Sequence, residues 1–353
     1  MHSLAITEQG VAIHIEGDQL LLQKNKAVLR RVRLGEIEQL VLLGQVELTS
    51  AAIAALARQG VDVVFLSRHG YFRARLLSAA SKNVQLRLAQ FQRCLDAAFA
   101  SRIAQAVLLG KITHQRQLLL RGQRKLRDDA LAQALGQLWI ILEQLRATTN
   151  LETLRGLEGR AAAIYFAHLP KLVQPPEFTF LGRSRRPPRD PFNACLSFGY
   201  TLLGRIIESE LLRAGLDPML GFLHQPHYGR PSLMLDLLEE LRPLIDSLVL
   251  RLVNRRQLGP LDFERHQGQD LAEILADPPS DELDADPAPE GVYLADTGRR
   301  VFLTEFFRRL RERLFYPPRQ ASLEWRDIIR EQVYHLARVI DGKDDAYRPF
   351  VPA

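Results

Sequence analysis

Four acid or imidazole side chains, in three separated segments, could together bind a metal ion. Glu158 lies in LRGLEGRAAAIYF, His224 in GFLHQPHYGR, and Asp236 and Glu239 in SLMLDLLEELRP. Carboxylate oxygens with a single imidazole suit Mg²⁺ or Mn²⁺, whereas a structural zinc site would need thiolates or several histidines. Since the chain has only two cysteines, these residues favour Mg²⁺ or Mn²⁺ as the ion.

Asp236 and Glu239 are three residues apart, so on a helix their side chains lie on one face. Leucines surround them on nearly every side of that helix, which predicts that both carboxylates are buried. A buried carboxylate needs a counter-charge, which a divalent cation would supply, as would Arg155, Arg160 or Arg242. A structural alternative stays open, in which one acid pairs with an arginine and the other is exposed.

Glu158 lies between Gly156 and Gly159, and small neighbours let a bulky ligand or another backbone approach closely. By itself a glutamate on a helix is usually just solvated. His224 is likewise ambiguous by itself, because a loop histidine often bonds only to backbone, and His227 could substitute for it.

Two regions of different periodicity must position these residues. Short apolar runs separated by turn glycines predict a β-rich domain over residues 1–78, with one short helix at 49–60 capped by Thr49 or Ser50. Beyond Asn83, longer amphipathic windows predict helices at 84–109, 110–126, 128–147, 151–168, 193–214, 232–256, 299–314 and 322–340. The predicted fold class is α+β: a small β-rich N-terminal domain, then a larger all-α C-terminal catalytic domain over 84–353.

Three local signals refine this division. Asp190 and Pro191 predict a helix start, and Gly215 the end of the same helix. Pro243 must kink its helix or begin a second one. Residues 277–290 contain six acids, no base and four prolines, which predicts a flexible, solvated segment without a catalytic role.

The composition is that of an ordinary globular protein with a modest basic excess. The net charge of +6 favours a polyanionic partner without proving one. Cys94 and Cys195 lack metal-binding spacing and are expected to be buried thiols in a reducing compartment. The first residues do not resemble a signal peptide and every long apolar run is broken by a charge, so we expect a soluble, cytoplasmic protein.

Several segments taken together carry a family resemblance: GLEGRAAAIYF, RRPPRDPFNACLSFGYTLL, GFLHQPHYGRPSLMLDLLEELRPLID and the closing YRPF. In combination and order they resemble the CRISPR-associated integrases that acquire new spacers, the first of the numbered Cas proteins. The resemblance implies that Glu158, His224 and Glu239 are the metal ligands. It places Asp236 one turn before the last ligand, where it would touch the ion directly or through water.

The resemblance also implies a reaction. The 3′-hydroxyl of an incoming DNA end would attack a target phosphodiester, with Mg²⁺ or Mn²⁺ as Lewis acid and with Asp236 or a water accepting the proton. The family acts as homodimers bridged by a small ferredoxin-like second numbered Cas protein. We expect the β-rich domain to form the homodimer, because its short strands leave edges that need cover.

Basic residues in GRSRRPPRDP are the strongest candidates for DNA phosphate contacts, with salt-sensitive binding as the consequence. Tyr165 and Asn193 lie in the family's motif blocks and are added to the DNA-binding set, although Tyr165 could equally be a core tyrosine. The predicted DNA-binding residues are Arg183, Arg185, Arg186, Arg189, Tyr165 and Asn193.

Two other functions stay open at this point. A structure-selective repair nuclease would use the same metal with water as nucleophile, and would shorten strands without joining them. A non-catalytic DNA-binding scaffold would use the carboxylates only structurally, so that Glu158→Ala would leave DNA turnover unchanged.

Overall fold

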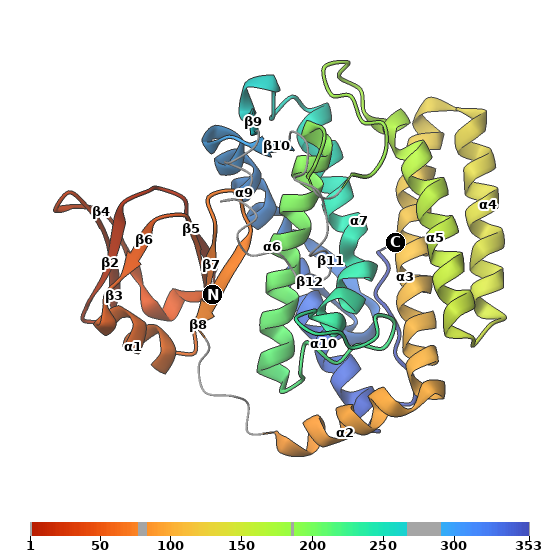
Figure 1. Ribbon diagram of the computed structural model, residues 1–353, viewed down its shortest axis with the longest axis horizontal. Coiled ribbons are helices and arrows are strands. Elements are labelled where there is room, and N and C mark those ends of the chain that lie inside the picture. Colours follow the sequence, from red (N-terminus) through yellow and green to blue (C-terminus); the bar gives the residue numbers. More distant parts are fainter. Residues whose placement is uncertain (1, 77–82, 185–186, 267–290, 353) are drawn as a thin grey trace.

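The computed structural model describes residues 2–76, 83–184, 187–266 and 291–352. Figure 1 shows the strands of the N-terminal part at one end of the molecule and a larger group of helices beside them. The predicted α+β fold class, with a strand-rich N-terminal part and a larger helical C-terminal part, is confirmed. The acidic segment 277–290 lies outside the described residues, as do Arg185 and Arg186.

The N-terminal part consists of two four-stranded sheets and one helix. Its elements are β1 (His2–Ile6), β2 (Val11–Glu16), β3 (Gln19–Lys24), β4 (Ala27–Arg33), β5 (Ile37–Leu43), β6 (Val46–Leu48), α1 (Ser50–Arg58), β7 (Asp62–Leu66) and β8 (Phe72–Leu76). The strand orders are β1-β5-β7-β8 and β4-β3-β2-β6. Thr49 caps α1 by accepting a hydrogen bond from the Ala52 amide, at 3.3 Å. The sequence predicts Thr49 or Ser50 for this role.

Strand β5 is apolar on both faces because its sheet is covered on both sides. Leu40 and Leu42 join the core between the two N-terminal sheets. Val41 and Leu43, which alternate with them, join the core of the helical part. The run of consecutive apolar residues in this strand therefore reflects burial on two sides.

Eight α-helices and four short strands are the main elements of the rest of the described chain. The helices are α2 (Val84–Leu95), α3 (Ala97–Leu126), α4 (Asp129–Arg146), α5 (Leu151–His168), α6 (Pro191–Ala214), α7 (Ser232–Asn254), α9 (Asp296–Leu310) and α10 (Trp325–Ile340). The strands form two antiparallel pairs, β9 (Phe263–His266) with β10 (Gly291–Leu294), and β11 (Arg313–Tyr316) with β12 (Ala321–Glu324). Hydrophobic periodicity did not predict these short ribbons.

The structure corrects one helix boundary and excludes one of the two alternatives at Pro243. The windows 84–109 and 110–126 are instead divided at Asp96, whose side chain caps α3 by accepting from the amides of Ala98 and Phe99, each at 3.0 Å. Pro243 does not begin a second helix, because α7 continues through it from Ser232 to Asn254. The predicted start at Asp190 and end at Gly215 are both found for α6.

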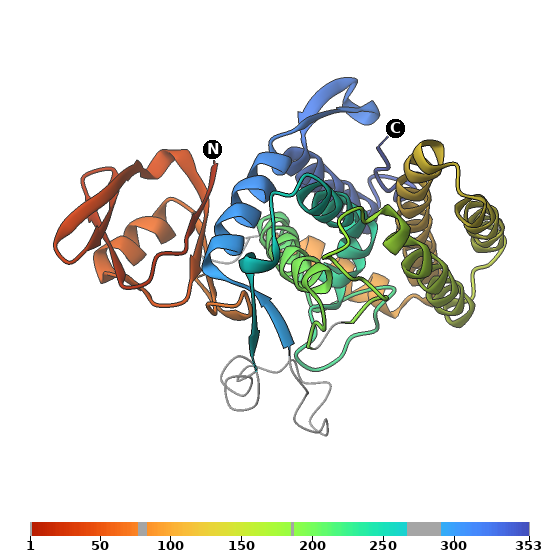
Figure 2. The same ribbon diagram turned by 90° about the horizontal axis from the view of Figure 1, so that it is seen from above.

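Helix α7 lies at the centre of the helical part. It packs against α3 on one side and α6 on the other, and α5 packs against α3 and α4. Figure 2 shows the same arrangement from above, with α3, α4 and α5 farthest from the N-terminal sheets. Within the described part of the chain, no helix combines the length and hydrophobicity that a membrane span requires.

Candidate active site

Helices α3, α5 and α7 bring the two predicted glutamate ligands together around one lysine. Lys111 of α3 contacts Glu158 Oε1 of α5, and its Nζ lies 2.6 Å from Glu239 Oε2 of α7. The Lys111 side chain is only 5% exposed. A single buried ammonium therefore links two carboxylates that are far apart in the sequence.

Glu239 is held in its charged form by two cations. The Arg242 Nη2 atom lies 2.9 Å from Glu239 Oε1, one helical turn further along α7. Burial by itself would raise the pKa of Glu239, but the charges of Arg242 and Lys111 outweigh burial and lower this pKa to about 2. Glu239 is consequently a carboxylate at neutral pH.

Asp236 organises the loop that carries His224. Its Oδ2 atom accepts hydrogen bonds from the amides of Phe222 and Leu223, at 2.6 and 3.0 Å. Its Oδ1 atom accepts from the His224 amide at 2.9 Å and lies 2.7 Å from His224 Nδ1. The buried carboxylate is thus surrounded by four donors from one loop, and none of its interactions is with the lysine that Glu158 and Glu239 share.

His224 is partly exposed, with 31% of its side chain accessible. It is close enough to Glu239 for its charged form to help lower the pKa of that carboxylate. Among the described residues, the ligand atoms of Glu158, His224 and Glu239 do not all lie within 4.8 Å of one another. The metal-ligand assignment of these three residues therefore remains a prediction.

The side chains of Glu158, Glu239 and His224 are of the types that bind a divalent cation. Two carboxylates from different helices already converge on one positive charge, and Lys111 Nζ lies 2.6 Å from Glu239 Oε2. Two hard oxygen donors beside an imidazole suit Mg²⁺ or Mn²⁺.

The face of α5 beside Glu158 is open. Gly156 and Gly159 are both exposed, and a Cβ atom added at either would meet nothing within 4 Å. The small residues around Glu158 therefore leave room for a large ligand.

Tyr165 and Asn193 are buried, which places neither of them to contact DNA directly. The Tyr165 hydroxyl donates to Asp246 Oδ2 at 2.7 Å, and the Tyr200 hydroxyl donates to the other oxygen of that carboxylate. Asn193 donates to the Gly182 carbonyl at 2.8 Å and accepts from Arg183 at 2.8 Å. Both side chains hold elements of the helical part together.

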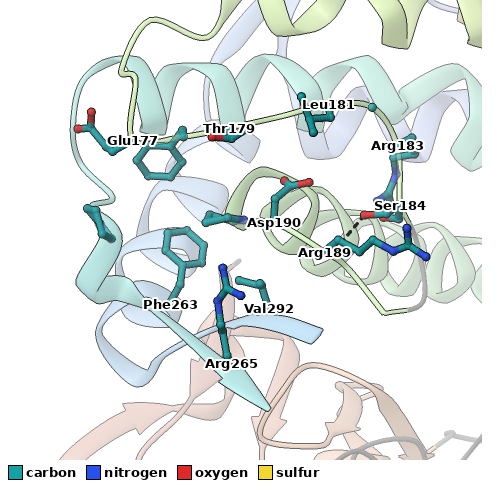
Figure 3. Close-up of a pocket in the computed structure, with 14 residues that line it drawn as sticks. Glu177, Thr179, Leu181, Arg183, Ser184, Arg189, Asp190, Phe263, Arg265 and Val292 are labelled. Carbon is teal, nitrogen blue, oxygen red and sulfur yellow. Dashed lines mark hydrogen bonds between the residues drawn. The ribbon is translucent and has the colours of Figure 1, made fainter. Parts of the chain in front are cut away.

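The two described arginines of the predicted DNA-binding segment line a pocket of about 710 Å³ (Figure 3). Arg183 is half-buried and bonds Asn193 and, at 3.0 Å, Ser197 Oγ. Arg189 is exposed and lies across the pocket from Arg265 of β9. The pocket is thus surrounded by three guanidinium groups, one of which comes from a strand that the sequence did not signal.

Several site residues escaped the sequence analysis. Lys111 carries no motif, and only the packing of α3 against α5 and α7 places its ammonium between the acids. Arg242 was one of three proposed counter-charges, and it is the one that pairs with Glu239. The other two bond elsewhere, Arg155 to the Leu223 carbonyl at 2.8 Å and Arg160 to Gln144 at 3.4 Å. The alternative with one exposed acid is wrong for this pair, because Asp236 and Glu239 are both buried.

A strand-rich N-terminal part followed by a helical part with convergent carboxylates defines a two-part α+β protein with a candidate acidic catalytic centre. A protein-family model described as "CRISPR associated protein Cas1" matches residues 4–308. The chain belongs to this Cas1 family.

Individual relatives agree with the family match. The chain is 35% identical to "CRISPR-associated endonuclease Cas1 2" of Rhodospirillum rubrum, over 99% of this chain and 98% of that protein. It is 36% identical to "CRISPR-associated endonuclease Cas1 3" of Thermus thermophilus, over 98% and 96%. A Cas4/Cas1 fusion of Geobacter sulfurreducens is 34% identical over 95% of this chain, which spans 58% of that longer protein.

Solved structures share the fold. A CAS1 protein from Thermotoga maritima superposes with a TM-score of 0.77 at 24% identity, covering 98% of both chains. A casposase bound to integration product gives a TM-score of 0.79 at 23% identity, over 99% of this chain and 93% of that one. A chain of a "Cas6-RT-Cas1–Cas2 complex" gives 0.80 at 24% identity, over 99% of this chain and 36% of that one.

Proposed function

We propose that this protein is a metal-dependent DNA integrase of CRISPR adaptation, which joins DNA 3′ ends to phosphodiesters of the repeat array. Membership of the Cas1 family, whose relatives are named endonucleases, supports the nuclease or integrase class. The observation that carries the proposal is the convergence of Glu158 and Glu239 on one buried positive charge, beside the loop of His224.

Glu158, Glu239 and His224 would hold Mg²⁺ or Mn²⁺. The bound ion would act as a Lewis acid on the target phosphate. For the two glutamates to become ligands, the Lys111 ammonium must withdraw from between them. Lys111 would then be a counter-ion that keeps the two carboxylates together until the ion binds.

Asp236 would orient His224. A carboxylate can only accept a hydrogen bond, so the proton of the neutral imidazole is on Nδ1, and Nε2 is left with a lone pair for the metal. Because Asp236 already accepts three backbone hydrogen bonds, we assign it this positioning role. The proton of the attacking 3′-hydroxyl would pass to a water molecule.

DNA would approach over the open face of α5 and past the pocket between β9 and the segment before α6. Arg189 and Arg265 are the proposed phosphate contacts, and Arg183 reaches the same pocket. Arg185 and Arg186 keep their predicted role from the sequence. We assign Tyr165 and Asn193 to support of these elements, because both are fully buried.

The partners follow from the family and from one edge of the N-terminal sheets. Among the described strands, β4 pairs only with β3, and its Val28 and Leu29 are each more than 40% exposed. An apolar strand edge of this kind supports a homodimer through the β-rich part, residues 1–78. The small ferredoxin-like second Cas protein is the proposed bridging partner, which the Cas1–Cas2 structural neighbours support. We also propose that the protein is located in the cytoplasm.

The test is a strand-transfer assay with a labelled DNA end, a repeat-containing target, the partner protein and Mg²⁺ or Mn²⁺. If a metal ligand contributes about 4 kcal/mol, Glu158→Ala should slow joining roughly 10³-fold. Glu152→Ala is the matched control, because Glu152 is on the same helix with 80% of its side chain exposed. It should join DNA at the parent rate.

The products separate this proposal from its competitors. Joined strands support the integrase. Strands that are only shortened would instead establish the nuclease, a reading favoured by the endonuclease names of the relatives. If Glu158→Ala leaves DNA turnover unchanged, the result would support the non-catalytic DNA-binding scaffold instead.

A further inference from the structure

We propose that His69, Glu264 and His266 form a second metal site, selective for Zn²⁺, that joins the N-terminal strands to the helical part. Among the described residues, these three alone form a group whose ligand atoms all lie within 4.8 Å of one another. The site shares no residue with the candidate active site and does not depend on the proposed function.

The elements that carry the three residues position them well. Glu264 and His266 are two residues apart on β9, so their side chains project from one face of that strand. Phe263 and Arg265 alternate with them and line the pocket of Figure 3 on the other face. His69 comes from the turn between β7 and β8, in the other half of the molecule. The site therefore bridges two units that are far apart in the sequence.

The turn that carries His69 is rigidly placed. Gly70 has a positive φ of 92°, and a Cβ atom there would collide with the Phe198 ring of α6. Next to it, Arg68 Nη2 lies 2.9 Å from Asp296 Oδ2 at the start of α9. The turn is thus pressed against the helical part on both sides of His69.

The distances are near those of a coordinated ion. Ligand atoms on tetrahedral zinc, with bonds of about 2.0–2.1 Å, are about 3.3 Å apart. His266 Nε2 lies 3.4 Å from Glu264 Oε1, and His69 Nδ1 lies 3.8 Å from the same oxygen. The two imidazole rings are 4.8 Å apart between centroids. Side-chain movements of less than about 1 Å would complete the geometry.

His69 offers the site a buried ring nitrogen. His69 Nδ1 is buried without a hydrogen-bond partner among the described residues. A neutral imidazole with an unused buried nitrogen is the form that binds metal.

The ligand types select the metal. Two imidazoles and one carboxylate, with a fourth position left for water, suit Zn²⁺ better than the oxygen-seeking Mg²⁺. Arg299 Nη1 lies 3.5 Å from Glu264 Oε1 and also donates to the Leu294 carbonyl, while Arg299 Nη2 contacts Asp296. Its charge weakens the attraction for a dication but also holds the carboxylate in place.

Zinc binding to the full-length protein tests the site. The background variant is His224→Ala, which removes the imidazole of the candidate active site. After chelator treatment, equilibrium dialysis against Zn²⁺ followed by elemental analysis should give one bound zinc per chain. Adding His69→Ala or Glu264→Gln should abolish this binding, and Mg²⁺ should not compete for it. Adding His14→Ala, a histidine on β2, is the matched control and should retain it.

Two further readouts keep the test decisive if a variant folds poorly. Co²⁺ should give a four-coordinate visible spectrum in the background protein and not after Glu264→Gln, which nearly preserves side-chain shape. Zn²⁺ should slow amide exchange in residues 67–71 and 263–266 together. A background protein without stoichiometric zinc, or equal zinc binding after His69→Ala and His14→Ala, would overturn the proposal.

Discussion

His224 Nδ1 lies 2.7 Å from Asp236 Oδ1. The same carboxylate accepts hydrogen bonds from the backbone amides of Phe222, Leu223 and His224. One buried side chain on α7 thus fixes both the backbone of the His224 loop and the orientation of its imidazole. The arrangement is local, because the loop lies directly before α7 in the chain and His224 is only twelve residues from Asp236.

Asp236→Asn should impair metal binding more than it impairs folding. Asparagine has one acceptor oxygen where aspartate has two, so a backbone amide or His224 loses its partner, at a cost of about 1–3 kcal/mol. Because the imidazole is then free to turn, Mn²⁺ affinity should fall by about 10- to 100-fold. Calorimetric Mn²⁺ titration checks this, with Asp217→Asn in the neighbouring loop as control. Unchanged affinity in Asp236→Asn would contradict the orienting role.

Lys111→Met should make stability depend on divalent metal. Removing the ammonium leaves Glu158 and Glu239 close together with less counter-charge, which should cost about 3–5 kcal/mol without metal. Mn²⁺ should restore much of that loss, and should raise the melting temperature of Lys111→Met more than that of the parent. Lys171→Met removes a surface ion pair to Asp128 and should change the stability little. A metal-insensitive Lys111→Met would show that the lysine and the ion do not share a position.

Glu240 should make the protein less stable as the pH rises. Burial raises its pKa to about 8 from an ordinary 4.5, although the hydrogen bond from Tyr347, at 2.8 Å, opposes the shift. The folded protein therefore retains a proton that the unfolded chain releases between about pH 4.5 and 8. Stability from this group is complete below pH 4.5 and is lost as the pH rises through 8.

Glu240→Gln should remove that dependence, because glutamine can accept the Tyr347 hydrogen bond without ever ionising. Urea midpoints measured from pH 5 to 9 should fall for the parent and stay flatter for the variant. Parallel curves for the two proteins would mean that Glu240 is ionised throughout.

Gly159 should tolerate a side chain for folding but not for DNA joining. A Cβ atom there meets nothing within 4 Å, so Gly159→Ala should stabilise α5 by up to about 1 kcal/mol. Gly159→Trp should fold as well, yet block the approach to Glu158 and reduce strand transfer at least tenfold. Gly136→Trp, on an equally open position of α4, is the control. Normal joining by Gly159→Trp would place the DNA path elsewhere.

Arg189→Ala should weaken DNA binding without unfolding the protein. If Arg189 contacts one phosphate, the slope of log affinity against log salt should become shallower by about 0.9. Arg183→Ala should instead lower thermal stability, since Arg183 bonds Asn193 and Ser197. Fluorescence anisotropy at several salt concentrations, with melting curves, separates the two effects. An unchanged slope for Arg189→Ala would remove it from the interface.

Local chemistry explains which helix ends could be predicted. Asp190 caps α6 through the Asn193 amide at 2.8 Å, and Gly215 ends it with a φ of 93°. Both depend only on neighbouring residues. The division at Asp96 is also a local cap, but the apolar pattern runs across it and hid the break. The β9–β10 ribbon could not be predicted, because four-residue strands contain too little periodicity and their partner is remote in the sequence.

The sequence by itself determined most of the helices, the buried character of Asp236 and Glu239, and the motif set that marks the Cas1 family. The helices and the burial of the two acids depend on residues within a turn or two of each other, and the motif set depends on the order of short segments along the chain. Only the tertiary structure decided that Lys111 lies between Glu158 and Glu239, that Tyr165 and Asn193 are buried, and that His69 meets β9. Contacts between distant segments depend on how helices and sheets pack, which no local pattern of residues specifies.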